Sequence, residues 1–245
     1  ALATVGVGIG AGAAVSVLKS SVEAYANLED QIRRNRAIMS ATAEQEKQLM
    51  QQTRDLGRST KFTAQEVAEA QMYQAMAGMK TNEVLEMTPK LLKMSIAAGS
   101  DFAQTSDIVT DNLSAFGMSI SEVDRLMDVM VATSNNANTN VQMLGEAYKY
   151  VAASSRNFES FENVNILLGV LADNGIKSGQ AGRNLAEIYR RLANPPKAVG
   201  NALKDLNIQL YDQKGKFKGL KAISDELKVA TANLTQEERN RYLAI

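Results

Sequence analysis

Two carboxylates in this sequence have a spacing that could support acid–base chemistry. Asp107 and Asp111 are four residues apart, so on a helix they would lie on the same face. A pair of carboxylates can share the general acid and general base roles, as in glycoside hydrolysis. The alternative, which we favour, is that one caps or bonds to a neighbouring loop while the other is solvated. We therefore predict no catalytic residue.

Three asparagines close together could bind a ligand through their amides: Asn135, Asn138 and Asn140. Short amide side chains in a polar run more commonly hydrogen-bond to their own backbone and hold an irregular loop. We predict that residues 133–140 form one tight loop, and that Asn138 or Asn140 caps a helix beginning near Val141.

Two glycine-rich stretches bear a weak likeness to nucleotide-binding motifs. Gly175–Gly182 places Lys177 and Ser178 beside glycines, but the phosphate-loop pattern with its preceding strand is missing. We predict a turn between two helices there. The other stretch, with Gly6, Gly8 and Ala11, has no βαβ unit around it. No cofactor is predicted.

Basic side chains form two clusters. Arg33, Arg34 and Arg36 lie close to Glu29 and Asp30, and the second cluster consists of Lys214, Lys216, Lys218 and Lys221. Either cluster could contact phosphates, but solvated charge is the usual explanation for such runs.

Composition excludes several classes of enzyme. The 245 residues include no His and no Cys, so there is no Ser-His-Asp triad, thiolate nucleophile, imidazole metal ligand or disulfide. No metal site is predicted. With 27 basic and 27 acidic residues the net charge is zero, which gives no electrostatic basis for sequence-specific nucleic-acid binding. The 45% share of apolar residues is ordinary for a globular protein.

Apolar residues recur at helical spacing over most of the chain, which predicts helices of about 12–18 residues between Lys19 and Leu206. Thr63-x-x-Glu66 and Thr235-x-x-Glu238 have the spacing of capping boxes. We expect helices to stop at Gly57, Gly78, Gly99, Gly117 and Gly175. The apolar stripes are Phe102, Val109, Leu113 and Phe116; Val123, Leu126, Met127 and Met130; Val141, Leu144, Tyr148 and Val151; and Leu185, Ile188, Tyr189 and Leu192.

Methionine is unusually frequent, with eleven residues. It suits surfaces that repack against several partners, but filling irregular gaps in a core is the role we favour here. The methionines in question include Met72, Met76, Met79, Met87, Met94, Met118, Met127, Met130 and Met143.

Residues 207–218 break the helical pattern. Apolar and polar residues alternate on both sides of the turn-like Gln213-Lys214-Gly215, which predicts a small β-hairpin. The expected fold is therefore all-α: a bundle of short-to-medium helices with one small β-hairpin near 207–218.

The chain divides into three predicted parts: residues 1–20, 21–206 and 207–245. Ala1–Leu18 carries no charge, and its glycines make small-xxx-small pairs that permit close helix packing, either in a protein or in a membrane. The middle part is a helical domain. The last part holds the hairpin and C-terminal helices, and it breaks off in an apolar run, so we expect a fragment of a longer protein.

Several short motifs follow one another in a recognisable order along the chain. They are the segments 60–70, 75–78, 97–99, 107–111, 115–118, 134–141, 145–146, 148–152, 174–177, 180–182, 207–218 and 234–244. This order resembles the core region of phage tail tape measure proteins. The resemblance covers Tyr25 to Ile245, and it departs from the family pattern at Met79, at Ala153 and at Ser178-Gly179.

The resemblance implies a structural, non-enzymatic protein of a phage tail. Tape measure proteins lie in the lumen of the tail tube, set its length during assembly and are released to help DNA cross the host envelope. The implied partners are the tail tube protein, baseplate and tail-tip hub proteins and tail assembly chaperones, with the protein itself a homotrimer. The same protein occurs in contractile bacteriocin-like particles. Two alternatives remain: a membrane-perturbing or pore-forming segment in residues 1–18, and a cell-wall hydrolase that uses Asp107 and Asp111.

Overall fold

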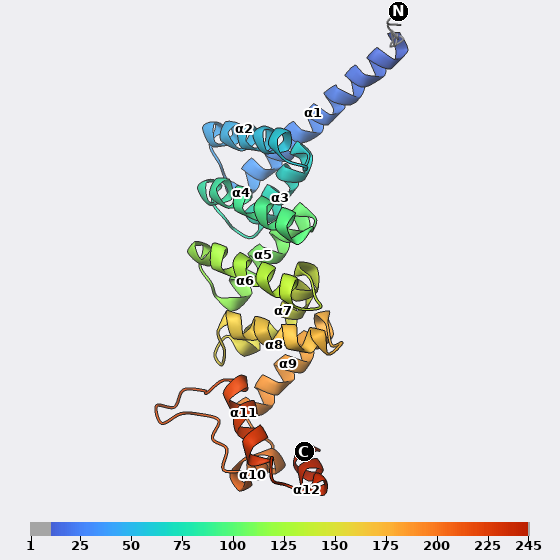
Figure 1. The fold of residues 1–245 in the computed structure, drawn as a ribbon. Coiled ribbons are helices and arrows are strands. Elements are labelled where there is room, and N and C mark those ends of the chain that lie inside the picture. The colour runs from blue at the N-terminus through green and yellow to red at the C-terminus, as the bar shows by residue number, and fades with distance from the viewer. Residues whose placement is uncertain (1–10, 245) are drawn as a thin grey trace, which may run out of the picture. The chain divides into compact units, whose positions relative to one another are not determined.

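A computed structural model of the chain describes the backbone of residues 11–244 and the side chains of residues 19–242 and 244. Over these residues the protein is all-α, with twelve α-helices, one short 3-10 helix and no sheet (Figure 1), which confirms the predicted class. The helices are α1 (Ala11–Met39), α2 (Ala43–Ser59), α3 (Ala64–Met76), α4 (Thr81–Ala98), α5 (Phe102–Phe116), the 3-10 helix η1 (Ile120–Glu122), α6 (Val123–Asn136), α7 (Val141–Ser155), α8 (Phe161–Asp173), α9 (Ser178–Ala193), α10 (Lys197–Asp205), α11 (Leu220–Ala230) and α12 (Gln236–Leu243).

Local signals set most helix ends. The hydroxyls of Thr63 and Thr235 each accept the backbone N–H of the glutamate three residues on, and that carboxylate accepts the threonine N–H in return. Four predicted stops have the positive φ that glycine adopts without strain. They are Gly78, Gly99, Gly117 and Gly175.

The predicted helix stop at Gly57 is wrong, because Gly57 lies inside α2 and does not end the helix. A Cβ atom at this position would lie 2.7 Å from the backbone nitrogen of Ala64. The missing side chain therefore lets the end of α2 approach the beginning of α3. Close packing, and not the freedom of the backbone, explains this glycine.

The predicted loop 133–140 is too long, since α6 continues through Asn136. Thr133 and Asn136 donate to backbone carbonyls one turn back, so both side chains are satisfied without ending the helix. The predicted cap is confirmed: the Asn140 side chain accepts the backbone N–H of Met143 at 2.8 Å.

The predicted β-hairpin at 207–218 is wrong. A single antiparallel bridge joins Tyr211 to Phe217, and no strand forms. The backbone N–H of Lys216 donates to the Asp212 carboxylate and not to the Asp212 carbonyl that a ladder would use. The apolar residues of the segment instead pack against α10 and α11, and the buried members of that cluster are Ile208, Leu210, Phe217 and Ile223.

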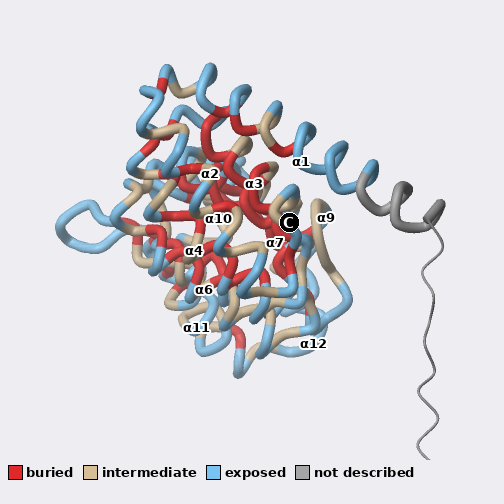
Figure 2. Tube along the Cα trace, turned by 90° about the horizontal axis from the view of Figure 1, so that it is seen from above, coloured by how far each residue is buried: buried red, intermediate tan, exposed pale blue. Residues whose placement is uncertain are grey.

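The chain forms two compact units, and the boundary between them falls within α5, between Asp111 and Asn112. In the first unit α3 packs against α1, α2 and α4. In the second unit α7 packs against α9, and α6 packs against α8. Figure 2 shows buried residues along these packed helices and exposed residues along the N-terminal part of α1. The three-part division at residues 20 and 206 stays a prediction.

The apolar stripes form the core largely as predicted. Val141, Leu144, Tyr148 and Val151 are all buried. The prediction that Ile188 belongs to the core is wrong. Its side chain is 41% exposed, because Leu185 and Tyr189 are the residues of α9 that face inward. Five of the eleven methionines are buried in the core, five are half-buried, and Met76 is exposed.

Polar side chains are also buried in the first unit, where they surround α3. They hydrogen-bond helix to helix and fix how the neighbouring helices sit on α3. The bonds are Thr53 to Gln71, Gln71 to Gln52, Gln74 to Thr88, Asn35 to the Ala68 carbonyl and Ser106 to the Ala70 carbonyl.

Candidate interaction surfaces

The carboxylates that could support catalysis lie on α5, where Asp107 is half-buried and Asp111 is exposed. Among the described residues, no group of three or more acidic, histidine or cysteine side chains is placed to hold a metal ion. No catalytic role is proposed for this pair.

The asparagine cluster serves the backbone. Asn140 caps α7, and the backbone N–H of Asn138 donates to the Asp173 carboxylate at 2.7 Å. Asn135 lies exposed in the last turn of α6. These contacts hold the connection between α6 and α7, and no ligand site is proposed from the three amides.

The predicted turn between two helices lies at residues 174–177, between α8 and α9, whereas residues 178–182 already belong to α9. Gly175 has φ of +85°, and α9 begins at Ser178. Gly182 lies inside α9, where a Cβ atom would be 2.1 Å from the carbonyl oxygen of Ala147. This glycine therefore permits the close contact of α9 with α7.

The arginine cluster on α1 forms exposed ion pairs. Arg33 pairs with Glu29, Arg34 with Asp30 and Arg36 with Glu46, at 2.9, 2.7 and 2.6 Å. Exposed pairs of this kind contribute little to stability.

The lysine cluster divides between paired and exposed side chains. Lys218 pairs with Glu226, and Lys221 pairs with Asp225. Lys214 and Lys216 are exposed in the loop before α11.

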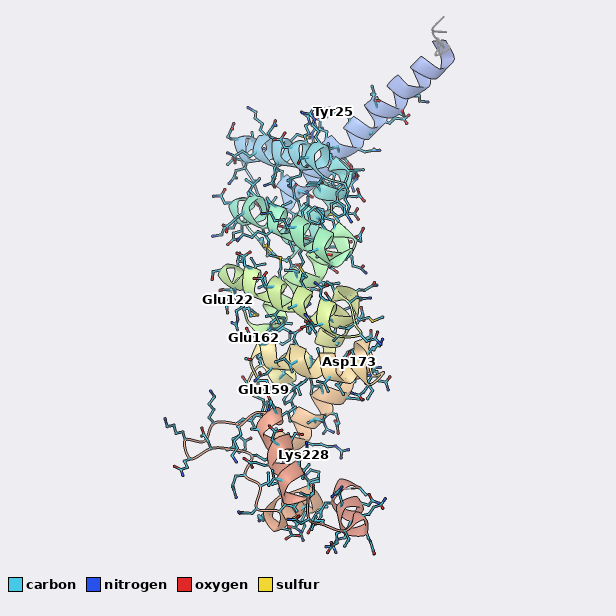
Figure 3. All side chains as sticks on the ribbon, viewed as in Figure 1. Tyr25, Glu122, Glu159, Glu162, Asp173 and Lys228 are labelled. Atoms are coloured by element: carbon cyan, nitrogen blue, oxygen red, sulfur yellow. The ribbon has the colours of Figure 1, made fainter. Side chains whose placement is uncertain are left out.

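The first candidate interaction surface is the segment of α1 formed by residues 19–27. Residues 19–27 are exposed on every side of the helix, whereas Leu28 and Ile32 are buried against the first unit. Val22 and Tyr25 continue the stripe of Leu28 and Ile32 outward, and they are 67% and 49% exposed. Tyr25 is labelled in Figure 3, and the Arg54 guanidinium of α2 lies 5.0 Å from the centre of its ring, so the first unit covers part of this stripe. Because a helix with little tertiary packing is marginally stable in water, residues 19–27 favour a partner.

A second surface is a groove of about 840 Å³ between α7 and α9. At its edge the Arg183 guanidinium lies 4.8 Å from the centre of the Tyr150 ring. Tyr189 also lines the groove, and its buried hydroxyl has no hydrogen-bond partner among the described residues. Burial raises the pKa of the Tyr189 phenol, and the negative charge of Glu159 raises it further.

An ion-pair network joins α6 to α8. The Arg125 guanidinium donates to both Glu162 oxygens and to Glu122. The hydrogen bonds from Arg125 lower the pKa of the Glu162 carboxyl to about 2. The two helices are therefore held by charge at this end.

Glu159 anchors the C-terminal part of the second unit. Its carboxylate accepts the backbone N–H of Leu220, the first residue of α11, at 2.6 Å. The adjacent Phe158 ring meets the Phe217 ring edge-on at 5.1 Å. Sequence reasoning missed this contact because the two partners are 61 residues apart.

The alternative hypothesis of a membrane-perturbing segment in residues 1–18 rests largely on residues 1–10, which lie outside the described residues. Among the described helices, none combines the length and the apolar character that crossing a bilayer requires.

Comparison with known proteins decides the family. Residues 50–245 match the model of the phage-related minor tail protein family. A tape measure protein of Pneumococcus phage Dp-1 is 35% identical over 225 residues, which is 91% of this chain and 20% of the relative. The chain belongs to the phage tail tape measure protein family. The resemblance seen in the sequence is thus confirmed.

A second tape measure relative is more distant. A probable tape measure protein of Escherichia phage P2 is 28% identical over 183 residues, which is 74% of this chain and 22% of the relative. The chain thus spans about a fifth of the length of these curated tape measure relatives. No solved structure matches it. Membership of the tape measure family gives the chain a structural role in a phage tail.

Proposed function

We propose that this chain is a folded assembly element of a tape measure protein that lies in the tail tube lumen. The whole protein sets the tube length during assembly and leaves the tube to help DNA cross the host envelope. This region contributes contacts with tail components, and the length is measured elsewhere in the protein. The observation that carries the proposal is the exposed segment of α1, residues 19–27, in a chain whose other helices fold compactly.

Compact folding argues against a ruler role for this region. Residues 112–245 drawn out as one helix would span roughly 200 Å at about 1.5 Å per residue. A compact unit of the same size has a radius of gyration of only about 14 Å. Each residue of a unit made of short helices that fold back on one another therefore adds little to the length that the unit spans.

The exposed stripe of α1 supports self-association. Val22 and Tyr25 would pack against the same residues of other copies, so that each copy covers the apolar stripe of its neighbours. We propose a homotrimer on this stripe. The tail tube protein, the baseplate and tail-tip hub proteins and the assembly chaperones remain the partners for the rest of the surface.

In-frame deletions in the full-length parent test the proposal. Removing residues 25–245 should abolish infectious particles. Removing an equal length from another helical region should shorten the tail by roughly 330 Å, at about 1.5 Å per residue. Normal infectivity with normal tail length after the first deletion would refute the proposal.

Sedimentation of the chain tests the trimer separately. Val22→Glu should abolish self-association because it places a charge on the stripe. Val229→Glu is the matched control, since Val229 is equally apolar and 76% exposed on α11. A trimer that persists in Val22→Glu would exclude the α1 stripe as its interface.

A further inference from the structure

A second groove lies between α6 and α8 and has a volume of about 390 Å³. Val129, Ile166 and Val170 line it, together with the small residues Ala132 and Gly169. A Cβ atom at Gly169 would come within 3.2 Å of the Ala137 side chain, so this glycine lets α8 approach the end of α6 at the floor of the groove. The surface of the groove is mainly apolar, with polar side chains such as Thr133 and Asn136 also lining it.

The outer face of α8 is apolar and uncovered. Val164, Leu168 and Ala172 are buried on the inner side of this helix. Ile166 and Val170, one turn apart on the other side, are 61% and 55% exposed. Surface helices normally present polar residues to water, and a helix that is apolar all round is normally covered on every side. The described chain covers α8 on one side only.

The surroundings of the groove are acidic. The helices η1, α6 and α8 carry five acidic residues and one arginine, a net charge of −4 in a chain whose total net charge is zero. Glu162 and Asp173 line the groove toward opposite ends of α8 (Figure 3). Arg125 is shared between Glu162 and Glu122, so its single positive charge does not neutralise both.

The length of the groove fits a helix. Glu162 and Asp173 are eleven positions apart on α8, which corresponds to roughly 17 Å, or about three helical turns. Three turns of a partner helix present apolar anchors at positions i, i+4 and i+7, the spacing used when amphipathic helices bind grooves.

We propose that the α6–α8 groove docks a cationic amphipathic helix of a partner protein. The apolar face of that helix packs on Val129, Ile166 and Val170. Its Lys and Arg side chains face the carboxylates around the groove, of which Glu162 and Asp173 are the nearest. The proposal goes beyond the role in tail assembly, and either can hold without the other.

Fluorescence anisotropy with the full chain tests the docking. The probe is a labelled 18-residue amphipathic helix made of Leu and Lys. It should bind, and binding should weaken as salt screens the charges. A Leu/Glu helix with the same apolar face, and a Leu/Lys peptide scrambled to lose that face, should each bind at least tenfold more weakly. Equal binding of the Leu/Glu helix would overturn the proposal.

Variants of the chain locate the site. Ile166→Ser and Val170→Ser should each weaken binding of the Leu/Lys helix by about tenfold with unchanged helix content, since both side chains are exposed and their loss leaves the core intact. Val229→Ser, an exposed valine on α11, is the matched control and should bind like the unmodified chain. Unchanged binding by both groove variants would overturn the proposal. So would a dimer of the unmodified chain that Ile166→Ser abolishes, because the occupant would then be a second copy.

Discussion

Two buried tyrosines of the second unit offer a direct test of how hydrogen bonding stabilises this fold. Tyr148 and Tyr189 are both fully buried. The Tyr148 hydroxyl donates to Asn165 Oδ1, whereas the Tyr189 hydroxyl has no hydrogen-bond partner in the part of the chain that the structure describes. Asn165 is itself buried, and its amide nitrogen donates to the Phe161 carbonyl. Replacing each tyrosine with phenylalanine should therefore have different effects.

The magnitudes follow from what each change leaves behind. Tyr148→Phe leaves Asn165 Oδ1 buried without a donor, which should lower the free energy of unfolding by about 1–3 kcal/mol. Tyr189→Phe removes a hydroxyl that is already unpaired and keeps the ring. The free energy of unfolding should stay the same or rise by about 1 kcal/mol.

Urea unfolding followed by the helical circular dichroism signal measures both effects. With an unchanged dependence on urea, a shift of the midpoint reports the change in stability. In a thermal scan, about 1 kcal/mol corresponds to roughly 3–5 °C for a unit of this size.

Alkaline pH gives an independent reading. Burial raises the pKa of both phenols. In the unfolded chain tyrosine ionises near pH 10, while the folded chain keeps these two neutral. Stability is therefore constant with respect to these groups below about pH 10 and falls above it. Each phenylalanine variant should lose part of that alkaline decrease.

One result would refute the reasoning about Tyr189. If Tyr189→Phe destabilises the unit as much as Tyr148→Phe does, the Tyr189 hydroxyl makes a hydrogen bond in solution. An unchanged midpoint in Tyr148→Phe would likewise show that the bond to Asn165 contributes nothing.

Three further predictions concern packing, capping and acid stability. Gly182→Ala should lower the free energy of unfolding in urea by about 3 kcal/mol or more, because the new methyl group meets the backbone of α7. Gly200→Ala, in open space on α10, should raise that free energy by about 0.5–1 kcal/mol. Equal effects of the two changes would argue against the close contact. Asn140→Ala should cost about 0.5–2 kcal/mol in a thermal melt, while Asn138→Ala should be neutral because only its backbone is bonded; the reverse order would disprove the cap. The stabilisation from Glu162 should be present above about pH 4.5 and be lost as the pH falls toward 2. Glu162→Gln should therefore flatten the dependence of stability on pH in that range. An unaltered dependence would contradict the lowered pKa of Glu162.

Features that depend on neighbours in sequence were predictable. The Thr63 capping box, the Asn140 cap and the glycine stop at Gly99 involve residues within a few positions of one another. The same local reasoning failed at Gly57, where the decisive neighbour is the backbone of α3. It failed again in the segment 207–218, where an Asp212 side chain competes with strand pairing.

The candidate surfaces were harder to predict. The apolar residues of α8 are not confined to one face, so their spacing does not reveal that Ile166 and Val170 remain exposed. The contact of Glu159 with Leu220 joins distant parts of the chain, which a single sequence does not reveal. A sequence alone suggests that glutamine side chains are exposed to solvent, because most of them are. The Gln71 side chain is nevertheless fully buried.

The polar residues around α3 give the two units different responses to temperature. Among the described residues, ten buried polar side chains lie in the first unit and four in the second. On unfolding, exposed apolar surface raises the heat capacity and exposed polar surface lowers it. The first unit should therefore have a smaller heat-capacity change per residue and a flatter stability curve. On cooling, the second unit loses stability sooner, while the hydrogen-bonded helices around α3 keep theirs.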